Sequence, residues 1–273
     1  MMEEAYGAAP QSSIPQKRIV DKLDEYMSRR DYAGAERHLL YWLAEAHAVG
    51  DKRGELLVRN ELVGHFRKTG NEKQALSHVE AALGLVDELG FGETISAGTT
   101  YTNAATALCA FDENERALGL FQKAAAVYEA SPQTASHLLG GLYNNLALAC
   151  VALQRFDEAD ALYQRALSTM ETVENGELER AITYLNMADA VVARSRVQAG
   201  GADADGVFAD AACEEKVGDL LDTALNLLDT PSVPRNGYYA FVCEKCAPTF
   251  AYYGYFLADA DLRERARAIY ERS

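Results

Sequence analysis

The chain has 273 residues, of which 49% are hydrophobic, and its formal net charge is −15 at pH 7. This length allows one elongated domain or two compact ones, and the hydrophobic content is sufficient for a core. The negative charge disfavours nucleic acid and anionic membranes as partners, because either would demand a basic patch, and the sequence contains none. The acidity is instead typical of a soluble surface.

The cysteines and the N-terminal sequence indicate in which cellular compartment the protein is expected. The five cysteines are scattered along the chain: Cys109, Cys150, Cys213, Cys243 and Cys246. An odd number in a chain of this length is not a disulfide framework and suits a reducing cytoplasm. Residues 1–16 lack the basic and apolar regions of a secretory signal, and we expect them to form a mobile tail. No apolar run is long enough to span a bilayer, so a cytoplasmic location is expected.

From Ile19 onward, amphipathic stripes with helical spacing recur in pairs. Each pair is interrupted by a short polar break, which predicts two helices joined by a tight turn. The breaks inside the first four pairs lie at Arg30-Asp31, Thr69 to Asn71, Asp112 to Asn114 and Gln154-Arg155. The best-formed pair spans Tyr143 to Leu167. Such a hairpin cannot bury both stripes alone, so it requires neighbours of the same kind.

The last third of the chain departs from this regularity. Tyr184 resumes the first-helix pattern, but residues 198–212 form an insertion rich in Gly, Ala and Asp, which predicts a flexible loop. The partner helix is expected to resume at Glu214. Residues 236–272 are rich in aromatic side chains and are expected to form a terminal capping pair, in which Pro248 starts or kinks a helix. The aromatic side chains of this pair either cover the end of the array or make a dimer contact.

A fixed repeat becomes visible when the small residue of each second helix is followed along the chain. This position is occupied by Ala35, Ala75, Ala117 and Ala159, at separations of 40, 42 and 42 residues. The larger apolar residue four positions later is Leu39, Val79, Phe121 and Tyr163. A constant period over four units is the signature of a solenoid.

The repeat resembles the tetratricopeptide repeat (TPR). The matching positions in the fourth pair are Asn145-Leu146-Ala147, Arg155 to Ala159, Tyr163 and Ala166-Leu167. The usual TPR period is about 34 residues. The longer period here is similar to that of kinesin light chains and of bacterial peptide-sensing regulators. It adds roughly one turn to each helix, at about 3.6 residues per turn. The resemblance covers residues 17–272 and implies an all-α, right-handed α-solenoid of about six hairpins in a single domain, 17–273.

The strongest functional candidate is a ladder of asparagines. Asn103, Asn145 and Asn186 each stand two residues after a tyrosine in successive repeats. Asparagine is a mediocre helix former, so its recurrence at one register in mid-helix needs a reason. A carboxamide carries both a donor and an acceptor and can hold a peptide backbone. The TPR resemblance implies that this position points into a concave groove. The alternative is that these asparagines are merely tolerated at exposed helix positions.

Further groove candidates lie near the ladder. The polar ones are Asn60, Thr99, Thr102, Thr106, Asn144 and Asp189. Arg67 and Lys68 lie toward the N-terminal end of the same face and could hold an acidic group. The clamp of chaperone-binding TPRs, which needs lysine and arginine where this chain has Thr and Asn, is missing.

Other motifs are incomplete. Cys243 and Cys246 form a CxxC, but two further zinc ligands are missing and no βαβ pattern supports a redox role, so buried helical thiols are the preferred interpretation. Asp203 and Asp205 hint at a calcium loop, but Gly201 and Ala212 stand where acidic ligands are required. No catalytic residue, metal site or cofactor site is predicted.

These observations predict a non-catalytic module that binds an extended peptide or protein segment, with neither nucleic acid nor membrane as partner. Two alternatives stay open. The chain could be a peptide-responsive sensor that acts on a partner protein, or a scaffold that binds through its aromatic C-terminal end, where a homodimer contact is also possible.

Overall fold

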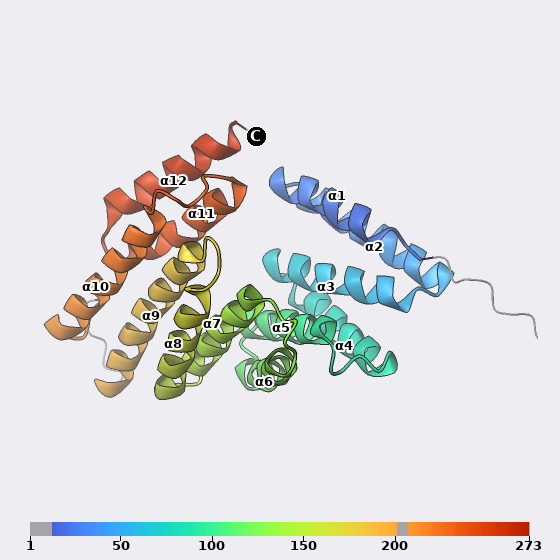
Figure 1. The fold of residues 1–273 in the computed structure, drawn as a ribbon, viewed down its shortest axis with the longest axis horizontal. Coiled ribbons are helices and arrows are strands. Elements are labelled where there is room, and N and C mark those ends of the chain that lie inside the picture. The colour runs from blue at the N-terminus through green and yellow to red at the C-terminus, as the bar shows by residue number, and fades with distance from the viewer. Residues whose placement is uncertain (1–12, 201–206, 273) are drawn as a thin grey trace, which may run out of the picture. The chain divides into compact units, whose positions relative to one another are not determined.

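The computed structural model describes residues 13–200 and 207–272, and the regular structure in these ranges is helical throughout. The contacts divide the chain into two compact units, residues 1–130 and 131–273. In Figure 1 the first unit runs from blue to green and the second ends in red. The single domain expected for 17–273 stays a prediction.

Three helical hairpins make up the first unit, and consecutive helices pack against each other throughout. They are α1 with α2, α3 with α4 and α5 with α6 (Figure 1). Their bounds are Gln16–Ser28, Tyr32–Val49, Lys52–Lys68, Glu72–Glu88, Ile95–Ala110 and Asn114–Ala130.

Three further hairpins make up the second unit: α7 with α8, α9 with α10 and α11 with α12. Their bounds are Ser136–Ala152, Phe156–Met170, Glu177–Gln198, Ala211–Leu228, Gly237–Tyr252 and Phe256–Tyr270. The described residues therefore form six hairpins, which confirms the predicted all-α solenoid of helical pairs. Across these residues, every helix falls short of the combination of length and hydropathy that a membrane span requires.

The first four hairpin turns lie at the predicted polar breaks, and each contains one residue in the left-handed region. These residues are Arg30, Gly70, Asp112 and Gln154, with φ between 55° and 72°. Gly254, with a φ of 86°, lies in the turn between α11 and α12, where no break was predicted. Left-handed backbone reverses the chain within few residues and is least costly for glycine. Side-chain caps start two of the following helices: Asp31 accepts the Gly34 amide, and Asn71 accepts that of Gln74.

The repeat positions identified in the sequence form the core. The small residues Ala35, Ala75, Ala117 and Ala159 are all buried, as are their larger partners Leu39, Val79, Phe121 and Tyr163. The small side chains allow the two helices of a hairpin to approach closely, and the larger ones fill the space beside them.

Three boundaries differ from those expected. Ile14 is buried in the first unit and its amide donates to Asp51, so the packed chain begins inside the predicted 1–16 tail, of which residues 1–12 lie outside the described residues. Helix α10 begins at Ala211 rather than Glu214, because Asp210 caps it. Pro248 lies within α11 and does not start a helix.

The predicted insertion loop, 198–212, is packed at its C-terminal side. Phe208 stacks on Tyr253, with 5.8 Å between ring centroids, and Val207 also contacts the core of the second unit. Residues 201–206 lie outside the described residues. The described end of the insertion is thus fixed against the C-terminal hairpin.

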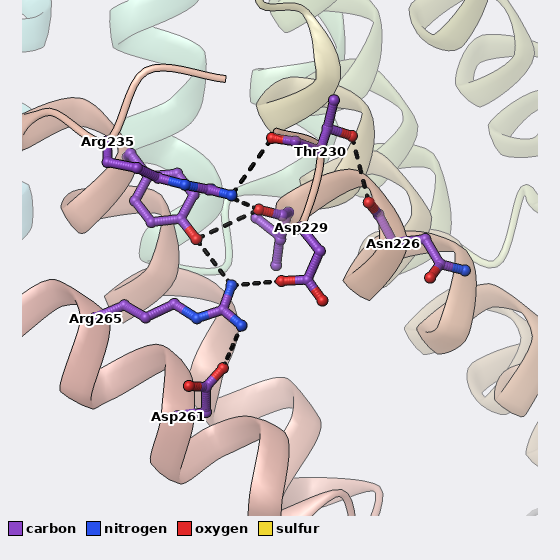
Figure 2. Close-up of polar contacts among 8 residues, drawn as sticks. Asn226, Asp229, Thr230, Arg235, Asp261 and Arg265 are labelled. Carbon is purple, nitrogen blue, oxygen red and sulfur yellow. Dashed lines mark hydrogen bonds and ion pairs between the residues drawn. The ribbon is translucent and has the colours of Figure 1, made fainter. Parts of the chain in front are cut away.

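A polar network fixes the C-terminal hairpin to α10 (Figure 2). Arg265 on α12 donates to Asp229, Asp261 and the Tyr239 hydroxyl. Arg235 donates to the last carbonyl of α10 and lies 4.1 Å from the Tyr239 ring centroid. Because Tyr239 is buried, these arginines satisfy its hydroxyl and cover its ring, which explains how a terminal hairpin stays anchored.

Candidate functional site

Odd-numbered helices of neighbouring hairpins contact each other, α3 with α5 in the first unit, and α7 with α9 and α9 with α11 in the second. We call the surface formed by these helices in each unit the odd-helix face. Most of the polar residues predicted to bind a peptide lie on it. Their hydrogen bonds show which of them bridge repeats and which are turned elsewhere.

In the first unit, two predicted asparagines are joined across neighbouring repeats. Asn103 on α5 donates from Nδ2 to Oδ1 of Asn60 on α3, at 3.4 Å. Asn60 in turn donates to the Thr100 hydroxyl at 3.0 Å and to the Leu56 carbonyl at 3.1 Å. Thr100 is fully buried and was missed by the sequence analysis. Asn60 is therefore a bridge between repeats, with Asn103 attached to it.

The second unit repeats this bridge. Asn186 on α9 donates from Nδ2 to Oδ1 of Asn144 on α7, at 3.1 Å. Asn144 is buried, whereas Asn145 is half-buried and makes no side-chain hydrogen bond to any described residue of its unit. The predicted ladder placed Asn103, Asn145 and Asn186 at one register, and the bridge joins Asn186 to Asn144, one residue before that register.

The register explains this difference. Asn103 and Asn145 are 42 residues apart, and Asn186 follows 41 residues later. Asn60 and Asn144 belong to a second register, one residue earlier in the repeat. In both bridges the later register donates to the earlier register of the preceding odd helix. Asn145, the middle member of the predicted ladder, belongs to neither bridge.

The three threonines of α5 that were predicted to line the groove are half-buried and are bonded within their own hairpin. Thr102 donates to the Gly98 carbonyl at 2.8 Å, and Thr106 to the Thr102 carbonyl at 2.8 Å. Thr99 bonds the Ile95 carbonyl and lies 3.0 Å from the Tyr128 hydroxyl of α6. Thr99 is therefore turned toward its hairpin partner, contrary to the groove position expected. Thr102 and Thr106 retain only acceptor capacity for a ligand.

The three charged candidates, Asp189, Lys68 and Arg67, lie in different surroundings. Asp189 on α9 accepts a hydrogen bond of 2.7 Å from the Tyr253 hydroxyl. Partial burial raises the pKa of the Asp189 carboxyl, and the bond from Tyr253 opposes this shift. Lys68 lies 5.4 Å from the ring centroid of Tyr32 on α2, so it is directed toward the preceding hairpin. Arg67 is exposed on α3, two helical turns after Asn60.

The CxxC cysteines are buried, in agreement with the prediction of helical core thiols. Cys243 and Cys246 lie in the core of the second unit. Burial raises the pKa of both thiols, that of Cys246 to about 12. Since the thiolate is the reactive form, both are chemically inert at neutral pH. Among the described residues, no group of three or more His, Cys, Asp and Glu side chains is placed to hold a metal ion.

Comparison with solved structures identifies the fold. The structure of BtubC (BKLC) from P. vanneervenii matches with a TM-score of 0.61 and 20% identity, over 77% of this chain and 78% of that one. The fold is of the TPR type. A TPR protein from Parabacteroides merdae ATCC 43184 matches with a TM-score of 0.44 and 15% identity, over 93% of both chains. TPR-like repeats of a kinesin light chain candidate from Podosopora anserina match with a TM-score of 0.48 and 16% identity, over 77% and 92%.

These likenesses describe the TPR fold alone. No protein-family model matches the chain, and no curated protein sequence matches it significantly. The function must therefore be argued from the side chains that this TPR array presents.

Proposed function

We propose that the chain is a non-catalytic binding module of the reducing cytoplasm, whose odd-helix face holds an extended segment of a partner protein. The TPR-type fold supports this proposal, because stacked helical hairpins present long faces to which a segment can bind at several repeats. The five free cysteines, four of them buried, are compatible with that compartment.

The observation that carries the proposal is the bridged asparagine. In each unit, one carboxamide donor is held by the preceding odd helix, at Asn103 and at Asn186. The Oδ1 atom of each makes no hydrogen bond to another described residue and stays available as an acceptor. Asn145 offers both its donor and its acceptor. A fixed amide binds a backbone with less loss of side-chain entropy than a free one, so the bridges preorganise the face.

Selectivity would come from the next position on the same helices, three residues after each ladder asparagine. It is occupied by Thr106, Leu148 and Asp189 in successive repeats. Leu148 is 38% exposed and can contact a bound segment. Within the second unit, the isobutyl group of Leu148 and the carboxylate of Asp189 would contact the side chains of a bound segment differently.

A second candidate surface lies at the aromatic C-terminal end. Tyr252, Phe256 and Leu257 are 52%, 69% and 89% exposed. Exposed apolar side chains close together in sequence favour a contact with another protein or with a second copy of this chain. This surface would serve the scaffold form of the function, and it shares no residue with the asparagine positions.

Selection from a displayed library of random extended peptides distinguishes the two surfaces. We expect selected peptides to lose binding to the Asn145→Ala variant, while the helical circular dichroism and melting of that variant stay unchanged because Asn145 bonds no residue of its unit. Peptides that retain binding to Asn145→Ala but lose it with Leu257→Ser would refute the odd-helix face. A change in scattering radius on peptide binding would identify the sensor form of the same function.

A further inference from the structure

The second unit contains a pocket of about 370 Å³ where the α8–α9 turn meets the segment that precedes α11. Four apolar side chains contribute to its walls, from Met170, Val173, Leu178 and Pro234. Its volume is at the lower end of the range of about 300–1,000 Å³ that is typical of ligand sites, so it suits a single side chain. None of the residues predicted from the sequence to bind a peptide lines it.

The turn that forms one side of the pocket has a fixed conformation. A Cβ atom at Gly176 would lie 2.1 Å from the carbonyl oxygen of Met170, so only glycine fits. The preceding residue, Asn175, has a φ of 60°, in the left-handed region that asparagine tolerates. The pocket is therefore formed by constrained backbone and does not depend on side-chain placement alone.

Two acidic residues line the pocket: Glu174 is exposed, whereas Glu179 is half-buried at the start of α9. Its carboxylate accepts a hydrogen bond from the Tyr238 hydroxyl, and among the described residues it forms no ion pair. Burial raises the pKa of Glu179, although the positive charges of Lys245 and His137 act in the opposite direction. A carboxylate that is partly removed from water without a paired cation would be stabilised by an incoming one.

Tyr238 contributes an aromatic surface beside this carboxylate. It is 48% exposed, and its ring is stacked on that of Phe241 with centroids 6.2 Å apart. The ring faces of tyrosine attract cations. A guanidinium group is planar, donates hydrogen bonds to carboxylates and stacks on aromatic rings, while its aliphatic stem can lie against an apolar wall.

We propose that this pocket binds an arginine side chain of a partner protein, with the guanidinium between the Glu179 carboxylate and the Tyr238 ring and the stem along Met170 and Val173. The net charge of −15 favours the approach of such a basic segment. The pocket and the asparagine positions share no residue. An experiment can therefore rule out binding at one site without ruling it out at the other.

The test uses the full chain and two short probes. In nitrogen-15 spectra, the peptide acetyl-Gly-Gly-Arg-Gly-Gly-amide is titrated and the backbone amides of Glu179 and Tyr238 are followed. The second probe replaces arginine by citrulline, which has a similar shape but no charge. We expect saturable shifts with the arginine peptide and binding weaker by about tenfold or more with citrulline, since the charge-assisted bond is lost.

Two matched variants complete the test. Glu179→Gln keeps the shape and an acceptor for Tyr238 and should weaken arginine binding by about tenfold. Glu177→Gln removes the same charge two residues away, outside the pocket lining, and should change binding less than about twofold. Equal binding of both peptides, equal effects of the two variants, or shifts confined to other residues would each overturn the proposal.

Discussion

The hairpin α5–α6 of the first unit and the hairpin α7–α8 of the second share one sequence pattern, 42 residues apart. Different side chains occupy the equivalent buried positions of the two hairpins. Gly98 lies under the ring of Tyr128, whereas the equivalent Gly140 lies under the side chain of Met170. The buried apolar partner is Phe121 in the first hairpin and Tyr163 in the second.

The repeat fixes how closely the two helix backbones approach, whereas the neighbouring side chains decide which substitutions each position tolerates. A ring that is itself held by a hydrogen bond cannot move aside, but an unbranched thioether can. A buried position shaped for a ring accepts either phenylalanine or tyrosine, but tyrosine requires a partner for its hydroxyl. The two units should therefore respond differently to the same substitution.

The largest expected difference concerns pH, because the first unit contains a buried imidazole. His78 is 7% exposed and stacks on Phe66. Burial, assisted by the charge of Arg59, lowers the pKa of His78 to about 4. The unfolded chain binds the proton more strongly, with a pKa of about 6.5, so stability falls as the pH drops from there toward 4. The expected loss is about 2 kcal/mol at pH 5 relative to pH 7.

Urea unfolding of the wild type and of His78→Gln at pH 7 and pH 5 checks this expectation. The variant should lack the part of the pH dependence that comes from His78. The raised pKa of Glu61 acts in the opposite sense but is present in both proteins and cancels. Equal pH dependence in wild type and His78→Gln would contradict the assignment.

The next difference concerns the two glycines. An alanine Cβ at position 98 would lie 2.4 Å from the Tyr128 ring, which is buried and bonded to Thr99. At position 140 it would lie 2.5 Å from the terminal methyl group of Met170. We expect Gly98→Ala to cost about 2 kcal/mol and Gly140→Ala less than about 1 kcal/mol, as for overpacking against rigid and flexible neighbours. Denaturant midpoints measure the stability of both variants, and a larger loss of stability in Gly140→Ala than in Gly98→Ala would contradict this expectation.

The smallest expected effect is at the aromatic position. Tyr163 is fully buried, and its hydroxyl has no hydrogen-bond partner among the described residues. Removing an unsatisfied buried hydroxyl recovers its desolvation cost, so Tyr163→Phe should raise stability by about 1 kcal/mol. The reverse change in the first unit, Phe121→Tyr, should lower stability by a similar amount or more. A loss of stability in Tyr163→Phe would show that the hydroxyl is satisfied.

Much of the fold could be predicted from the sequence because helical periodicity and turn residues act locally. The breaks at Arg30 and Gln154 became left-handed turns, and the small residues of the repeat became core. The start of the packed chain was misplaced, because Ile14 is held by Asp51, 37 residues away, and periodicity does not report such contacts.

The candidate site was predictable only in part. The asparagine registers were visible, but pairing depends on how neighbouring helices are staggered, and Asn186 bonds Asn144 of the adjacent register. The presence of asparagine at both adjacent registers of α7 was a signal that could have revealed this. The Glu179 pocket was missed because it combines a turn, a helix start and a distant segment, none of which is periodic.

The central claim is that the odd-helix face binds a peptide backbone through its asparagines. The most direct measurement follows the side-chain amide signals of Asn103, Asn145 and Asn186 in nitrogen-15 spectra during titration with a library-selected peptide. The account predicts a saturable shift of the Asn145 amide, the one free of bridges in its unit, at the same peptide concentration that saturates binding. Saturated binding with unchanged asparagine signals, and shifts only near Tyr252 and Leu257, would contradict it.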